Sequence, residues 1–243
     1  MQKETDNWYA SWFDTPYYHI LYKDRDYQEA GLFMNELTSF LSLGKNSEIL
    51  DLACGKGRHA KYLNKLGYRV TGVDLSPTSI DFAKKFERDG LHFEVYDMCL
   101  PYPKKFDAVF NLFTSFGYFE NENDNLRTIK AIKSELKENG YGVIDFLNAD
   151  YVKRNIVPSE TKIIEGIEFF IDRYIDNGYI IKDIKFFHNG REHFYTERVK
   201  AISLDNFNDY FAEAGVSIKH CFGDYHLQPF DPITSERLIL IFN

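Results

Sequence analysis

The chain has 243 residues, of which 44% are hydrophobic and 27% are charged, as is ordinary for a globular protein. This length fits one α/β domain with an insertion better than two full domains. The net charge of -8 disfavours a nucleic-acid partner, because phosphate-backbone binding requires clustered Lys and Arg. The three cysteines form no CxxC pair, so we expect neither a disulfide framework nor a bound metal. No stretch is apolar enough for a signal peptide or a membrane span, which predicts a cytoplasmic protein without a membrane partner.

The first two thirds of the chain alternate between strand-like and helix-like patterns. Apolar spacing over residues 26–43 predicts a helix that ends before Gly44. Strands are then expected at 48–53, 69–73, 91–96, 107–112 and 142–147, with helices at 58–66, 76–88 and 123–137. Such alternation is typical of a parallel sheet with helices on both faces.

After residue 150 the pattern changes to runs of alternating aromatic and β-branched residues. Two Asn-Gly pairs, at 177–178 and 189–190, interrupt these runs and favour type I′ hairpin turns. We therefore expect a three-stranded antiparallel meander, with strands at 163–175, 179–188 and 191–200. A helix over 203–214 and strands at 216–222 and 237–242 follow it. The expected domains are an aromatic arm and helix (1–44), a core (45–150 and 201–243) and an inserted antiparallel lid (151–200).

A glycine-rich segment, DLACGKGRHA at 51–60, joins the first expected strand to a helix. Such a turn lets a ligand approach the backbone closely at a helix N-terminus. Gly55, Gly57 and Ala60 also satisfy the GxGxxG/A dinucleotide fingerprint, so the glycines alone do not select the cofactor. Asp74, which ends the second strand, is placed to bind ribose hydroxyls, and Asp97 ends the third strand where it could meet an adenine amino group.

Two further features disfavour a dinucleotide. Asp51 lies at the end of the first strand, where a nicotinamide-binding strand is normally apolar up to its first glycine. The region after residue 150 also offers neither a second mononucleotide-binding half nor a catalytic domain of the dehydrogenase kind.

From about residue 26 to its end, the chain resembles the class I S-adenosylmethionine-dependent methyltransferases. The resemblance is carried by DLACGKGRHA (51–60), GVDLS (72–76), YDM (96–98), NLFTSFGYF (111–119) and ENGYGVIDF (138–146). It implies a Rossmann-like α/β fold, with a seven-stranded, mostly parallel sheet and a small antiparallel insertion. It also implies S-adenosylmethionine as the cofactor. The sequence departs from the commonest glycine pattern by having Ala53 and Cys54 in the loop.

The same resemblance assigns the cofactor-binding residues. Those expected at the methionine part are Asp51, Ala53, Gly55 and Gly57; at the ribose, Asp74 with Leu75; at the adenine, Asp97 and Met98; and beneath the sulfonium, Asn111 and Leu112. Arg58 could pair either with the carboxylate of the cofactor or with an acidic side chain such as Asp51. His59 is expected on the surface of the following helix.

The methyl acceptor has to be inferred from other features. The Asp/Asn-Pro-Pro-aromatic segment of DNA and RNA amino-methyltransferases is absent after Asn111, and that position lacks the carboxylate of metal-assisted enzymes. Asp145, Asn148 and Asp150 fit a strand end and an N-capping loop better than a metal site. An antiparallel insertion together with an aromatic N-terminal segment resembles the small-molecule N- and O-methyltransferases, in which such elements form a lid. A non-catalytic protein that binds the cofactor or its product, and an NAD-type enzyme, remain alternatives.

The N-terminal segment concentrates aromatic residues, namely Trp8, Tyr9, Trp12, Phe13, Tyr17, Tyr18 and Tyr22. Two interpretations stay open: a gate that closes over the cofactor, with Tyr18 and Tyr22 touching it, or an arm packed permanently on the protein. His19 is the candidate for a general base, if the reaction uses one.

Overall fold

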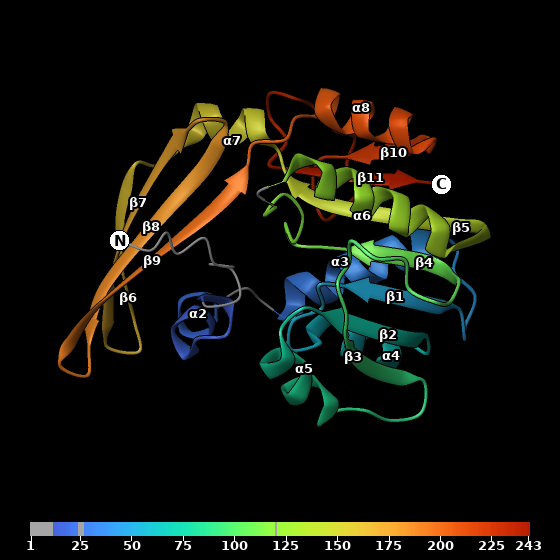
Figure 1. The fold of residues 1–243 in the computed structure, drawn as a ribbon, viewed down its shortest axis with the longest axis horizontal. Helices are drawn as coiled ribbons and strands as arrows, with labels where there is room; N and C mark the ends of the chain where they lie inside the picture. Colours follow the sequence, from blue (N-terminus) through green and yellow to red (C-terminus); the bar gives the residue numbers. More distant parts are fainter. Residues whose placement is uncertain (1–11, 24–26, 120) are drawn as a thin grey trace. The chain divides into compact units, whose positions relative to one another are not determined.

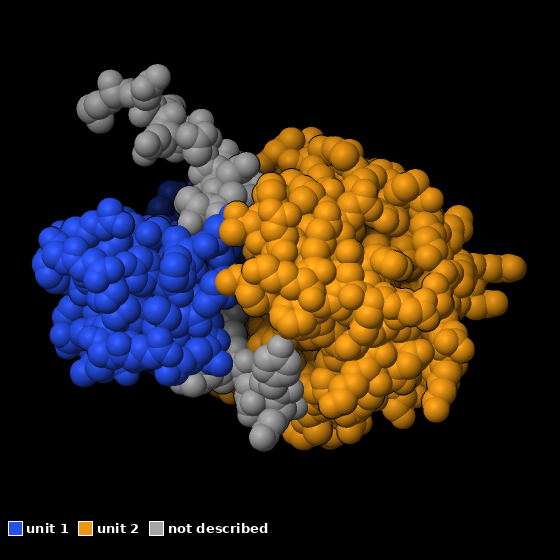
Figure 2. Space-filling view, turned by 90° about the horizontal axis from the view of Figure 1, so that it is seen from below, with its two compact units in different colours: residues 1–25, 153–201 blue, residues 26–152, 202–243 orange. Residues whose placement is uncertain are grey.

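The computed structural model describes residues 12–23, 27–119 and 121–243. The chain divides into two compact units, one made of residues 1–25 and 153–201 and the other of residues 26–152 and 202–243 (Figure 2). The described residues 12–23 belong to the unit that contains the expected insertion.

The larger unit is built on a seven-stranded sheet with the order β10-β11-β5-β4-β1-β2-β3 (Figure 1). Its strands are β1 (Glu48–Leu52), β2 (Arg69–Asp74), β3 (Leu91–Val95), β4 (Phe106–Asn111), β5 (Leu136–Leu147), β10 (Ile218–Phe222) and β11 (Arg237–Phe242). Strands β1 to β5 pair in parallel, whereas β11 is antiparallel to both of its neighbours. The predicted mostly parallel, Rossmann-like sheet is confirmed.

Helices cover both faces of this sheet. They are α3 (Tyr27–Phe40), α4 (Arg58–Lys65), α5 (Pro77–Lys84), α6 (Glu122–Glu135) and α8 (Leu204–Ala214). A further helix, α7 (Ala149–Asn155), follows β5 and spans the boundary between the two units. Ile239 and Ile241 of β11 belong to the core cluster that includes α3 and α4 residues, whereas the Phe242 ring contacts Phe211 of α8. Since successive strand side chains point to opposite faces, α3 and α4 cover one face and α8 the other. None of the described helices is long and apolar enough to cross a membrane.

Caps explain several of the helix boundaries. The Ser76 hydroxyl accepts a hydrogen bond from the Ser79 N–H at the start of α5, and Gly215 ends α8 with φ +67°. Helix α5 ends at Lys84, short of the expected residue 88, because Arg88 exchanges backbone hydrogen bonds with Leu91 in a turn that leads into β3.

The smaller unit contains a four-stranded antiparallel sheet in the order β6-β7-β8-β9. Its strands are β6 (Ser159–Ile164), β7 (Ile167–Asp176), β8 (Tyr179–His188) and β9 (Arg191–Lys200). Both Asn-Gly pairs have left-handed φ, 47° and 80° at 177–178 and 52° and 78° at 189–190, which confirms the predicted turns. The expected meander of three strands was incomplete, because a third left-handed pair, Glu165-Gly166, separates β6 from β7.

The N-terminal segment forms part of the core of the smaller unit. Thr15 caps the short helix α2 (Pro16–Leu21) by accepting a hydrogen bond from the Tyr18 N–H. Trp12 and Leu21 are buried in a cluster with apolar residues of β7 and β8, among them Phe169 and Phe186. The described part of the segment is therefore joined to the antiparallel sheet by apolar packing.

Candidate active site

The glycine loop lies between the end of β1 and the start of α4. Ala53, Gly55 and Gly57 all have left-handed φ, at 57°, 52° and 76°. A side chain at Gly57 would lie 2.5 Å from the Phe93 ring, so that glycine is needed for packing as well as for its turn. A Cβ at Gly55 would meet nothing within 4 Å, which leaves the backbone there open to a ligand.

Asp74 ties the end of β2 to this loop. One of its carboxylate oxygens, Oδ2, accepts a hydrogen bond of 2.8 Å from the Gly55 N–H, and the other, Oδ1, accepts one of 2.9 Å from the Ser76 N–H. A carboxylate oxygen has two lone pairs and can accept more than one hydrogen bond. At the end of the neighbouring strand, Asp97 accepts a hydrogen bond from the Cys99 N–H in the same manner.

Asp51 is a buried acid directly before the loop. Its side chain is 1% exposed, and its Oδ2 atom has no hydrogen-bond partner among the described residues. The pKa of Asp51 is raised from 3.8 to about 7, chiefly by burial and also by the nearby Asp74 charge. The Ala60 N–H and the Arg58 charge act in the opposite direction. A cationic ligand group beside Asp51 would stabilise its ionised form.

Asn111 provides a second buried oxygen without a partner at the same edge of the sheet. Its Nδ2 group donates to the Leu52 carbonyl at 3.4 Å and lies 3.5 Å from the Met98 sulfur, whereas Oδ1 has no partner among the described residues. The register pairs Leu52 with both Asn111 and Val73, so the ends of β1, β2 and β4 lie side by side. The structure therefore brings together the predicted residues of the strand ends and the glycine loop.

These residues fit a cofactor that carries a positive charge and hydrogen-bond donors. A buried polar atom without a partner is costly, so two such oxygens at one edge are a reason to expect a ligand there. The open backbone at Gly55 and the Asp74 carboxylate that it contacts lie beside them.

The expectation for His59 was wrong, because this residue is 8% exposed and stacks on Phe113 with 4.8 Å between ring centroids. The pKa of His59 is lowered from 6.5 to about 3, chiefly by burial and also by the adjacent Arg58 charge. The ring is therefore neutral, and its Nε2 can accept a hydrogen bond from the Arg58 guanidinium, which lies 3.1 Å away. The same guanidinium lies 4.7 Å from the centre of the Phe113 ring.

A buried ion pair next to β4 was not predicted as part of the site. Asp145 is fully buried in β5, and its Oδ1 accepts hydrogen bonds of 2.8 and 2.6 Å from the Arg237 guanidinium. Its Oδ2 accepts from the Phe113 N–H at 2.8 Å and from the Tyr225 hydroxyl at 3.3 Å. The sequence signal was an acid at the end of an apolar strand, in ENGYGVIDF, but nothing in the sequence indicates its partner 92 residues away.

Comparison with known proteins places this arrangement in a family. Residues 49–140 match the family described as Methyltransferase domain. A Bacillus subtilis protein named as a methyltransferase, YqeM, is 32% identical over 124 residues. These residues are 49% of this chain and 50% of that protein. A Streptomyces venezuelae protein named dTDP-3-amino-3,4,6-trideoxy-alpha-D-glucopyranose N,N-dimethyltransferase is 28% identical over 122 residues, which are 45% and 51% of the two chains. The chain thus spans about half the length of these curated relatives.

Similarity of fold extends further than similarity of sequence. The crystal structure of an S-adenosylmethionine-dependent methyltransferase from Clostridium acetobutylicum superposes with a TM-score of 0.79, covering 93% of this chain and 95% of that one at 21% identity. Residues 49–140 therefore match a methyltransferase domain, and the chain has the fold of the class I S-adenosylmethionine-dependent methyltransferases. The predicted family is confirmed, and the glycine loop lies within the matched domain.

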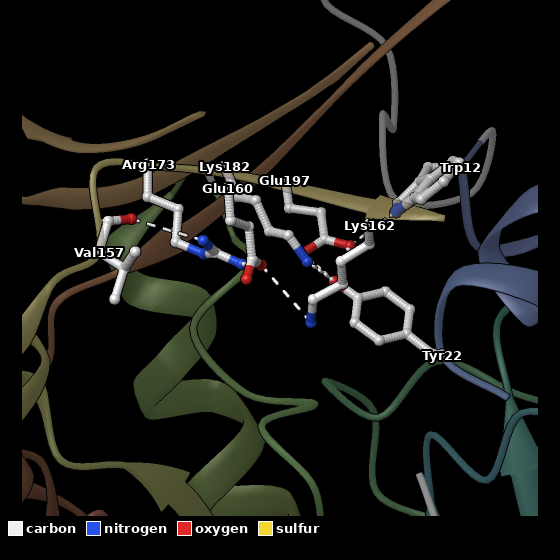
Figure 3. A network of polar contacts seen from close by, with 8 residues as sticks. All are labelled: Trp12, Tyr22, Val157, Glu160, Lys162, Arg173, Lys182 and Glu197. Atoms are coloured by element: carbon white, nitrogen blue, oxygen red, sulfur yellow. Dashed lines mark hydrogen bonds and ion pairs between the residues drawn. The ribbon is translucent and has the colours of Figure 1, made fainter. Parts of the chain in front are cut away.

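The remaining predicted site residues of the chain, Tyr18, Tyr22 and His19, belong to the smaller unit. The Tyr22 hydroxyl donates to both carboxylate oxygens of Glu197, at 2.6 and 2.8 Å, and accepts from Lys182 (Figure 3). The Tyr18 ring packs against the Tyr22 ring with 4.9 Å between centroids. The His19 ring meets the Tyr18 ring edge-on, with 5.3 Å between centroids. Contact of these residues with the cofactor stays a prediction, and Trp8 and Tyr9 lie outside the described residues.

Proposed function

We propose that this methyltransferase acts in the cytoplasm and transfers the methyl group of S-adenosylmethionine to a nitrogen or oxygen atom of a small molecule. One observation supports this proposal above all. At one edge of the sheet, the open Gly55 backbone lies beside side-chain oxygens of Asp51 and Asn111 that have no hydrogen-bond partner among the described residues. When bound, the cofactor supplies a methyl group that its sulfonium has already activated. The protein has to hold the acceptor close to that group and aligned with it.

In this proposal the end of each strand binds a different part of the cofactor. Asp74 accepts hydrogen bonds from the ribose hydroxyls, with Leu75 beside it, and Asp97 and Met98 contact the adenine. The cationic methionine moiety lies over the loop that contains Ala53, Gly55 and Gly57 and faces Asp51, while Asn111 and Leu112 lie beneath the sulfonium. Arg58 is the candidate to pair with the carboxylate of the cofactor.

The smaller unit supplies the lid in this proposal. Tyr18 and Tyr22 contact the cofactor when the lid is closed, and His19 is the candidate base for an acceptor that must lose a proton. Its antiparallel sheet supports the small-molecule interpretation. The name of the Streptomyces relative makes a nucleotide-linked amino sugar the first acceptor to test.

The decisive experiment has a binding part and a transfer part. Calorimetry with S-adenosylmethionine, its demethylated product and NAD identifies the cofactor, and we expect binding of the first two only. The protein is then incubated with methyl-labelled S-adenosylmethionine and either a dTDP-linked amino sugar or a metabolite extract, and products are identified by mass spectrometry. Binding of NAD alone would refute the cofactor assignment. Binding of S-adenosylmethionine without any labelled product would instead indicate a non-catalytic binding protein.

A further inference from the structure

Two consecutive non-glycine residues with left-handed backbone follow β4. Phe113 and Thr114 have φ of 57° and 60°, a conformation that residues with a Cβ rarely adopt and that is especially unusual for β-branched Thr. They come directly after Asn111 and Leu112, which we place beneath the sulfonium. Backbone strain of this kind persists only where the surrounding structure enforces it, and it is concentrated at functional sites.

Asp145 and Arg237 enforce this conformation through hydrogen bonds to both residues of the turn. The Asp145 side chain accepts from the Phe113 N–H at 2.8 Å, and its backbone carbonyl accepts from the Thr114 N–H at 2.9 Å. Arg237 binds Asp145 with two nitrogens and donates from Nη2 to the Thr114 hydroxyl oxygen at 3.0 Å. Both peptide N–H groups of the turn and the Thr114 side chain are thereby fixed from β5 and β11.

The side chains of the turn are fixed as well. The Phe113 ring stacks on the rings of His59 and Tyr225, with centroid distances of 4.8 and 5.2 Å. The Thr114 hydroxyl accepts from Arg237, which has no acceptor of its own, so the hydroxyl proton must point elsewhere. Within the described residues that proton has no acceptor, and the Thr114 side chain is only half-buried. The result is an oriented hydrogen-bond donor just beyond the end of β4.

We propose that Asp145 and Arg237 are positioning residues that hold the Phe113–Thr114 turn in its left-handed conformation and present the Thr114 hydroxyl as a hydrogen-bond donor to an oxygen of the methyl acceptor. This inference rests on the proposed function and narrows it to polar acceptors with a hydrogen-bonding oxygen near the methylated atom. The ion pair is internally neutral, so it orients Thr114 without adding a net charge that would attract or repel the acceptor.

The test measures cofactor binding and acceptor use separately. Wild type, Thr114→Val and Thr114→Ser are titrated with S-adenosylmethionine by calorimetry. Label transfer from the methyl-labelled cofactor is then followed over a dilution series of one metabolite extract, which gives a relative half-saturating acceptor concentration. We expect Thr114→Val to bind the cofactor within about twofold of wild type but to need about three to ten times more extract, as loss of one neutral hydrogen bond predicts. Thr114→Ser restores the hydroxyl and should return to the wild-type value.

Two controls separate positioning from general stability. Thr38→Val makes the same change in α3, where the hydroxyl donates to the Met34 carbonyl, and should leave the extract dependence unchanged. Arg237→Lys should raise the half-saturating concentration as Thr114→Val does, and the double variant should be no worse than either single one, because both changes remove the same contact. Additive effects, or normal extract dependence in Thr114→Val, would overturn the positioning role. If wild type itself transfers no label, the proposed function fails first and this role fails with it.

Discussion

Replacing Asp51 with asparagine should make the protein more stable at high pH while weakening cofactor binding. The substitution keeps the shape of the side chain and removes a buried negative charge. In the folded protein the pKa of Asp51 is raised to about 7 from 3.8, chiefly by burial. The folded state therefore holds the proton over a range in which the unfolded chain has lost it, and wild-type stability falls as the pH rises from about 4 to about 7. The amide side chain of the Asp51→Asn variant does not titrate, so the variant escapes this loss.

The size of the effect follows from the shift in pKa. One pKa unit corresponds to about 1.4 kcal/mol, so the ionised carboxylate costs the folded state about 4 kcal/mol at pH 8. At pH 5 only the unfolded carboxyl group is ionised to a large extent, and the cost is about 2 kcal/mol by the same linkage. Any other consequence of the amide is the same at both pH values, so the variant should gain about 2–3 kcal/mol more over wild type at pH 8 than at pH 5.

Urea unfolding of both proteins without cofactor, at pH 5 and pH 8, measures this difference directly. Asp209→Asn, which changes an exposed carboxylate on α8, is the matched control. Calorimetry at pH 8 should show weaker S-adenosylmethionine binding to Asp51→Asn, since the amide cannot neutralise a cationic group. An equal stability difference at the two pH values would refute the burial argument, and unchanged cofactor affinity would refute the place of Asp51 at the methionine moiety.

Three further predictions concern the loop and the N-terminal segment. Asp74→Ala should lose about 1.5–3 kcal/mol of S-adenosylmethionine binding in calorimetry, the range for hydrogen bonds to a charged group, and an unchanged dissociation constant in a folded variant would remove its ribose role. Gly55→Val should abolish that binding while the protein still melts cooperatively; normal binding would make the loop a simple strand–helix turn. Because Glu197 accepts hydrogen bonds from Trp12 and Tyr22, amide exchange should show residues 12–22 protected without cofactor, and Glu197→Ala should remove this protection. Protection that appears only with cofactor would support the gate instead.

The sequence predicted those parts of the fold that depend on local patterns. Strands β1 to β4 and both Asn-Gly turns follow from hydrophobic periodicity and from residues that tolerate left-handed φ. The turn at Glu165-Gly166 was missed because Glu is not a usual residue for that conformation, so β6 and β7 were not separated.

The candidate site was predictable only where it follows the order of the chain. Asp51, Asp74 and Asn111 end neighbouring parallel strands, and the carboxyl ends of such strands meet at one edge. Tertiary contacts decided the rest. His59 has a helical position that suggests exposure, yet the Phe113 ring covers it. The pairing of Asp145 with Arg237 depends on β11 lying antiparallel to β5, and no local pattern contains that information.

The smaller unit is built from two segments that lie far apart in the chain, and this affects the order in which the protein can fold. The Trp12 indole donates to Glu197, a residue 185 positions later in the chain. During synthesis from the N-terminus, Trp12 and the tyrosines of α2 emerge long before the sheet on which they pack. Strands β1 to β5 are complete by Leu147, before any strand of the smaller unit has been made. Contacts of such long sequence separation form late in folding. The parallel sheet is therefore expected to form first, while the N-terminal segment is still without its partners on the ribosome.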